Sequence, residues 1–137
     1  MFCFPLIAAA AAGALFFTQN NFSDCEVGGV KFSNQCWRDN PICISQKELR
    51  YQQCMADKGR KCWKLQPELA AVNFLNNEFI SEDYRCAAAT VCDMEVCCDK
   101  AYVVLSFSDC SKMAFELYQP VTKGCTGIWV VRRYAYV

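Results

Sequence analysis

Cysteine is the residue whose chemistry dominates this chain, because the 137 residues include twelve cysteines and no histidine. A thiol can form a disulfide, bind zinc or act as a nucleophile. No two of the cysteines have C-x-x-C spacing, which argues against a redox pair or a zinc ribbon, so no metal site is expected. We therefore predict about five disulfides. The candidates are Cys25, Cys36, Cys43, Cys54, Cys62, Cys86, Cys92, Cys97, Cys98, Cys110 and Cys125.

The number of these cysteines is odd, which has a consequence for partners. Adjacent residues such as Cys97 and Cys98 do not easily bond to each other, so we expect them to connect two different partners to one point. With Cys3 in the apolar N-terminus, one of the remaining eleven thiols has no mate within the chain. It could join a second chain, carry a lipid or cofactor, or stay buried as a free thiol.

The lack of histidine also bears on catalysis. It removes Ser-His-Asp, Cys-His and His-metal arrangements, so we expect a protein that is not an enzyme and has no cofactor. A hydrolase built on paired carboxylates is the alternative. Its candidates are Glu78, Glu82, Asp93 and Glu95, all in polar stretches typical of solvated surface. Asp93, Glu95 and Asp99 lack the spacing and the glycine of a calcium-binding loop.

Charge is balanced overall but unevenly distributed. Fourteen basic residues offset fourteen acidic ones, which argues against nucleic acid as a partner. The block between residues 47 and 64 contains six basic residues and two acidic ones. The block between residues 68 and 99 contains seven acidic residues and one basic residue, Arg85. The two blocks either solubilise the surface or face each other, or the basic block binds an acidic partner.

Aromatic residues give a second indication of a binding surface. Trp37 and Trp63 each follow a cysteine, where an indole packs against a disulfide or anchors an interface. The chain ends in an aromatic stretch that is either packed on the core or offered to a neighbour. The candidate interface residues are Trp37, Trp63, Trp129, Tyr134, Tyr136, Arg60 and Lys61.

The N-terminus sets the expected location. Residues 1–18 are predicted to be a signal peptide or a single membrane anchor, since residues 1–17 are apolar and uncharged. Residues 19–24 form a polar linker that includes Asn21, the acceptor of a glycosylation sequon. Residues 25–137 then form one domain. Either fate of the N-terminus predicts that this domain is secreted or lies on the extracytoplasmic face of a membrane, and a membrane contact is expected only if residues 1–17 are retained.

Local signals predict the elements that precede residue 100. Gly28 and Gly29 lie between valines, as in a short hairpin or an extended arm. Ser45 and Glu48 have capping-box spacing, which predicts a helix from there to about Lys58. A second helix begins at Pro67 and shows apolar residues at helical spacing. A third helix is predicted over 82–98 through its alanine run.

The last third predicts strands. Residues 101–107, 113–118 and 128–137 are rich in β-branched and aromatic residues and are separated by turn-like segments. The predicted fold is α+β: a small disulfide-rich domain of two to three helices followed by a three-stranded antiparallel β-meander, with the helices packed on one face.

These features together predict a non-catalytic binding or assembly protein outside the cytosol. Its partner is another protein or a second copy of itself, and one possible link is an intermolecular disulfide through the odd cysteine. The alternative is a single-span accessory subunit of a larger membrane complex, with residues 1–17 as the span.

Overall fold

The computed structural model describes residues 26–78 and 89–137. The predicted signal or anchor, the linker with Asn21, and Cys25 and Cys86 lie outside the described residues. Within those residues the fold is β-rich, with seven strands in two antiparallel sheets and two α-helices. The larger sheet has five strands in the order β3-β7-β6-β5-β4.

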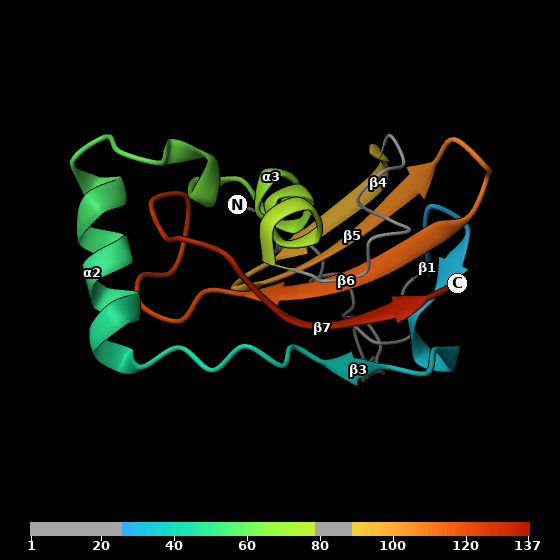
Figure 1. The fold of residues 1–137 in the computed structure, drawn as a ribbon, viewed down its shortest axis with the longest axis horizontal. Helices are drawn as coiled ribbons and strands as arrows, with labels where there is room; N and C mark the ends of the chain where they lie inside the picture. The colour runs from blue at the N-terminus through green and yellow to red at the C-terminus, as the bar shows by residue number, and fades with distance from the viewer. Residues whose placement is uncertain (1–25, 79–88) are drawn as a thin grey trace, which may run out of the picture.

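Four consecutive strands form most of the larger sheet. They are β4 (Ala89–Cys97), β5 (Lys100–Phe107), β6 (Lys112–Tyr118) and β7 (Val130–Tyr136), each antiparallel to the next. The two-residue β3 (Arg38–Asp39) extends the sheet by pairing with β7. The sheet therefore ends at β4 on one side and at β3 on the other (Figure 1).

The remaining elements surround this sheet. The strands β1 (Glu26–Val27) and β2 (Val30–Lys31) form a hairpin and lead into the short helix η3 (Phe32–Asn34). The helix α2 (Gln46–Asp57) stands beyond one end of the sheet, as Figure 1 shows. It is followed by η4 (Cys62–Leu65), by α3 (Pro67–Asn73) and by the π-helical turn η5 (Phe74–Glu78).

The core has two parts because successive strand residues point to opposite faces of the sheet. On one face, α3 and η5 bring Ala71, Phe74 and Leu75 against residues such as Val103 and Phe115. On the other face, the β1–β2 hairpin and η3 cover a smaller cluster of buried residues, which are Val27, Val30, Phe32, Tyr102, Val104 and Ala114. The sheet is thus covered by a helix on one face and by a hairpin on the other.

The predicted fold class is wrong. The larger sheet has five strands where a three-stranded meander was expected, and α3 covers one of its faces while α2 lies at its end. The third predicted helix is also wrong over residues 89–97, which form β4, while residues 82–88 lie outside the described residues. The physical reason is that β4 pairs with β5 from Ala89 to Cys97, and such long-range pairing overrides a weak helical preference.

The expected disulfide framework is also not found. No disulfide joins two cysteines within residues 26–78 and 89–137. Eight of the nine cysteines there are exposed and Cys97 is partly exposed, so none of these cysteines belongs to either core cluster.

Several local predictions are confirmed. The hydroxyl of Ser45 accepts a hydrogen bond from the Glu48 amide at 3.1 Å and starts α2, which ends just before Gly59. Pro67 occupies the first turn of α3. Gly28 and Gly29 form the two-residue turn of the β1–β2 hairpin, both with positive φ. Among the described helices, none is long and apolar enough to cross a membrane.

Candidate functional site

The position of α2 depends on a buried glutamine. Gln53 is 3% exposed, and its side-chain amide donates a hydrogen bond to the Thr126 carbonyl at 2.8 Å. Its side-chain oxygen accepts a hydrogen bond from the Ile128 amide at 3.0 Å. Gln53 therefore satisfies two backbone groups of the β6–β7 loop and fixes α2 to the end of the sheet.

The β6–β7 loop is itself held by a second buried glutamine. The side-chain amide of Gln119 donates to the Gly124 carbonyl at 2.6 Å, and its oxygen accepts from the Gly124 amide at 2.9 Å. Gly127 lies beside this pair, where an added Cβ would overlap the Thr122 carbonyl. The loop can close in this form only because residue 127 has no side chain.

The chain between α2 and η4 contains an unusual backbone conformation. Lys61 has φ of 53° and lies in the left-handed region, although it is neither glycine nor asparagine. Conformations of this kind cost free energy and tend to occur at binding sites. Here the conformation ends the loop after α2 and starts η4, which places Lys61 next to Trp63.

A hollow of about 480 Å³ lies between α2, this loop, η4 and the end of α3. Its size is in the range of pockets that hold a ligand or a peptide side-chain cluster. Its lining residues are Glu48, Tyr51, Gln52, Met55, Arg60, Lys61, Trp63, Lys64 and Asn73. We refer to it as the basic–aromatic pocket.

The chemistry of the basic–aromatic pocket is that of a site for an anion with apolar surface. Among its described lining residues, three are cations and one, Glu48, is a carboxylate, which already accepts a hydrogen bond from Gln52 at 3.2 Å. The Lys64 ammonium lies 4.4 Å from the centroid of the Trp63 ring. Tyr51 is 59% exposed and adds a second aromatic surface. A cation next to an indole is suited to a carboxylate attached to an apolar chain.

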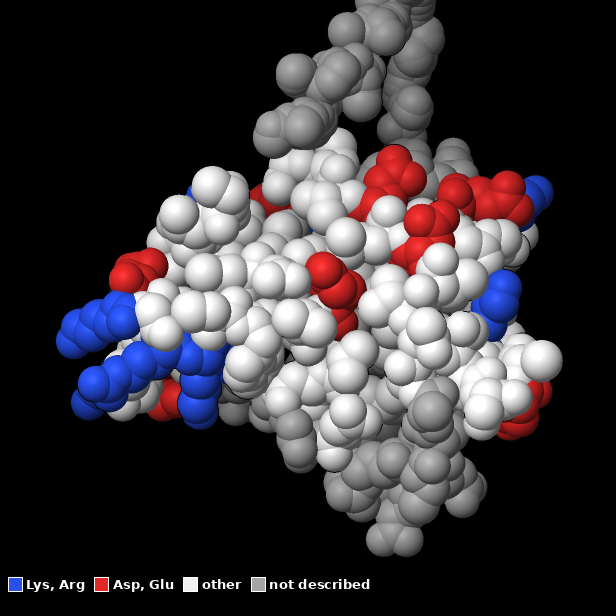
Figure 2. All heavy atoms as spheres, turned by 90° about the horizontal axis from the view of Figure 1, so that it is seen from above, with Lys and Arg blue, Asp and Glu red and all other residues white. Residues whose placement is uncertain are grey.

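The charge on this face of the molecule is not uniform. Figure 2 shows basic side chains gathered at the end of the molecule that contains α2, while acidic side chains lie mostly over the rest of the face. A few acidic side chains lie beside this basic group, and some basic side chains lie at the opposite end, so the two signs are unevenly distributed rather than fully separated. Such a gathering of one sign attracts an oppositely charged partner over about one Debye length.

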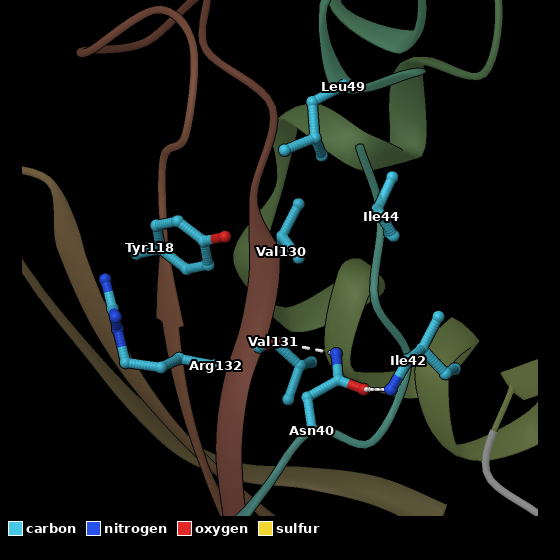
Figure 3. Close-up of a pocket in the computed structure, with 8 residues that line it drawn as sticks. All are labelled: Asn40, Ile42, Ile44, Leu49, Tyr118, Val130, Val131 and Arg132. Atoms are coloured by element: carbon cyan, nitrogen blue, oxygen red, sulfur yellow. Dashed lines mark hydrogen bonds between the residues drawn. The ribbon is translucent and has the colours of Figure 1, made fainter. Parts of the chain in front are cut away.

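A smaller hollow of about 140 Å³ lies beside the segment that leads into α2 (Figure 3). Asn40 holds that segment to β7, since its side-chain amide donates to the Val131 carbonyl at 2.8 Å and its side-chain oxygen accepts from the Ile42 amide at 2.9 Å. The hollow has a mixed lining, in which Ile42, Ile44 and Val130 lie together with the polar side chains of Asn40 and Arg132 (Figure 3). A third hollow between the two shares Trp63 and Lys64 with the basic–aromatic pocket.

The structure brings only some of the predicted interface residues together. Arg60, Lys61 and Trp63 all line the basic–aromatic pocket. Trp129 and Tyr134 are 5% and 7% exposed and belong to the core.

The two other predicted aromatics pack under arginines. The Trp37 ring lies 4.5 Å from the guanidinium of Arg133, and the Tyr136 ring lies 5.0 Å from that of Arg38. These rings therefore stabilise the sheet surface near β3 and β7 rather than the pocket.

The carboxylates that the hydrolase alternative requires lie elsewhere. Asp93 accepts hydrogen bonds from the amides of Gly28 at 3.1 Å and Met94 at 2.8 Å, which attaches β4 to the β1–β2 hairpin. Glu95 is on the exposed strand β4, and Glu82 lies outside the described residues. In the described part of the chain, no group of three or more cysteine or carboxylate side chains could hold a metal ion.

A buried ionic cluster was not predicted from the sequence. Glu116 is 3% exposed and lies 2.6 Å from the guanidinium of Arg133 and 3.7 Å from that of Arg132. Two consecutive strand residues reach the same carboxylate because β6 and β7 shift register after Glu116. The available signal in the sequence was a glutamate between the apolar residues Phe115 and Leu117.

One further pair joins two loops. Asp99 in the β4–β5 turn and Lys123 in the β6–β7 loop form an ion pair at 3.1 Å. The hydrogen bond from Lys123 lowers the pKa of the Asp99 carboxyl from its ordinary value. This pair holds the two loops at the end of the sheet nearest α2.

Comparisons with models of protein families, with curated proteins and with solved structures found no match.

Proposed function

We propose that this chain is a non-catalytic, extracytoplasmic protein-binding protein that binds an acidic segment of a protein partner in the basic–aromatic pocket. The observation that carries the proposal is the composition of that pocket, in which Arg60, Lys61 and Lys64 line the same hollow as the exposed Tyr51 and the half-buried Trp63. Aromatic and arginine side chains dominate the energetics of protein interfaces. The cysteine content supports a location outside the cytosol.

An acidic peptide segment suits this pocket better than a strong polyanion such as nucleic acid. The chain has no net charge, so it lacks the field that draws a whole domain to phosphate backbones. The three cations of the pocket belong to η4 and the loop before it, and Met55 and Tyr51 contribute apolar surface to the same hollow. Aspartate or glutamate alternating with apolar residues would match both features.

The proposal is tested by fluorescence anisotropy with a short peptide in which glutamate alternates with leucine. Lys61→Glu should weaken binding by about fivefold to tenfold, since one attractive charge becomes repulsive. Trp63→Ala should weaken it by about tenfold. Lys47→Glu is the matched control, because Lys47 belongs to the same basic block but does not line the pocket.

Three results would overturn the proposal. They are undetectable peptide binding, equal losses for Lys61→Glu and Lys47→Glu, and tighter binding of a single-stranded oligonucleotide than of the peptide. The last result would assign the pocket to nucleic acid.

A further inference from the structure

The edge strand β4 of the larger sheet has exposed acidic and apolar side chains, which are complementary to the basic and aromatic side chains of the pocket. The strand β4 ends the strand order, and its residues from Thr90 to Val96 are exposed. Within it, Asp93-Met94-Glu95-Val96 alternates acidic and apolar residues. An edge strand of this length with exposed apolar side chains is a known site of association with other chains.

A bulge in β4 determines which side chains lie together. The register with β5 shifts between Val91 and Asp93, so Val91, Met94 and Val96 face Leu105, Val103 and Ala101 respectively. Because Val103 and Leu105 belong to the cluster covered by α3, the three apolar residues of β4 lie on that same face. They are 39%, 36% and 43% exposed.

The alternation of the strand places the two acidic residues together on the other face. Asp93 and Glu95 face Val104 and Tyr102, which belong to the cluster covered by the hairpin. The edge therefore presents carboxylates on one side and apolar side chains on the other. The basic–aromatic pocket offers the complement, with three cations beside Tyr51, Met55 and Trp63.

From this complementarity we infer that the chain self-associates head to tail, with the Asp93–Val96 edge of one copy bound in the basic–aromatic pocket of the next. This inference rests on the proposed function, because it names the acidic partner as a second copy of the chain. A symmetric contact between two β4 edges would bring like charges of Asp93 and Glu95 close together, which is unfavourable.

The two surfaces share no residue, so each copy can use both at once. In an open head-to-tail assembly, the copy at one end has a free basic–aromatic pocket and the copy at the other end has a free β4 edge, so further copies can bind. The expected behaviour is therefore growth with concentration rather than a closed dimer, and weakening as salt screens the charges.

Sedimentation velocity of the full chain over a range of concentrations and salt tests this inference. Lys61→Glu and Glu95→Lys should each weaken self-association by about tenfold, since each places like charges in contact. Both side chains are exposed, so neither change should affect folding, and thermal unfolding checks this. Asp93 is left unchanged because it holds the β1–β2 hairpin.

The decisive variant carries both reversals. Lys61→Glu with Glu95→Lys exchanges the charges across the contact and should restore self-association to near the original level. An equimolar mixture of the two single variants should also associate more strongly than either alone. Lys47→Glu should have little effect, as it changes the net charge equally without touching the pocket.

The outcomes separate this inference from the proposed function. If the glutamate–leucine peptide binds and the chain stays monomeric at every concentration, the self-association is wrong and the proposed function stands. Self-association that neither reversal weakens, or that the double variant fails to restore, also overturns the inference. Failure of both the peptide and the self-association removes the pocket as a binding site.

Discussion

Lys61 links backbone conformation to binding at the scale of one residue. Its φ of 53° costs about 1 kcal/mol for a residue with a side chain, and glycine adopts this conformation without that cost. We predict that Lys61→Gly leaves the free energy of unfolding unchanged or raises it by up to about 1 kcal/mol, while it weakens peptide binding. Denaturant unfolding and anisotropy on the same sample measure both quantities.

Lys58→Gly is the control for this change, because Lys58 has φ of −91° and gains nothing from glycine. It should lower the stability without a comparable loss of peptide affinity. Equal losses of stability in the two variants would contradict the claim that the left-handed conformation of Lys61 is strained.

Gly127 is the residue on which the β6–β7 loop depends. Its position leaves no room for a Cβ against the Thr122 carbonyl, which is backbone and cannot move aside easily. Gly127→Ala should lower the free energy of unfolding by about 1–3 kcal/mol, as measured by chemical denaturation. Gly59→Ala separates crowding from backbone strain, because Gly59 has φ of 82° but open space around its Cα. A loss no larger than that of Gly59→Ala would contradict the steric explanation.

At the scale of elements, the contact of α2 with the sheet end forms one side of the pocket. Gln53→Ala removes hydrogen bonds to Thr126 and Ile128 in a buried location. We predict a loss of about 2–3 kcal/mol of stability, since the backbone groups that Gln53 satisfied stay buried without a partner. The substitution should also increase the rate of hydrogen exchange at the Ile128 amide by more than it increases the rates at the amides of β5. Unchanged exchange at Ile128 would show that Gln53 does not hold the loop.

The Asp99–Lys123 pair makes the attachment of the two loops sensitive to acid. The pKa of Asp99 is lower in the folded chain than its ordinary value of 3.8, so the ionised form favours folding. The stabilisation is complete above that value and is lost as pH falls through the folded pKa. The stability of Asp99→Asn should therefore depend less steeply on pH below about pH 4 than that of the unmodified chain. Identical curves for the two proteins would contradict this role.

The elements also show how much of the fold could be predicted from the sequence. Ser45, Pro67 and the Gly28-Gly29 pair act within a few residues of themselves, and each element they predicted is present. The strand β4 has no such local signal, because the alanines before and within it favour a helix and its pairing with β5 decides the outcome. The two-residue β3 likewise exists only through its contact with β7.

The candidate site was predicted in the same partial way. Arg60, Lys61 and Trp63 are close in sequence, so their proximity needed no knowledge of the fold. Asn73 and Tyr51 join them only because α3 and α2 meet at η4, which is a tertiary contact. Trp129 looked like a surface anchor but completes the core, since the sequence alone does not give the face of the sheet on which it lies.

At the scale of the whole molecule, balanced charge and unevenly distributed charge have different consequences. A chain with no net charge has little long-range attraction for any partner. Basic side chains still gather at one end (Figure 2), and three of them line the pocket between α2 and η4. Binding should therefore depend on salt through the few charges at the contact, and on the apolar residues of the partner for the remainder.

The central claim is that an acidic and apolar segment binds in the basic–aromatic pocket, and NMR chemical-shift mapping with the glutamate–leucine peptide tests it most directly. We predict that the largest changes occur at Lys61, at the Trp63 indole and at Asn73, and that Lys61→Glu reduces them. Changes centred on Ile42 and Val130 in the smaller hollow, or on β4, with the pocket resonances unmoved, would contradict the claim.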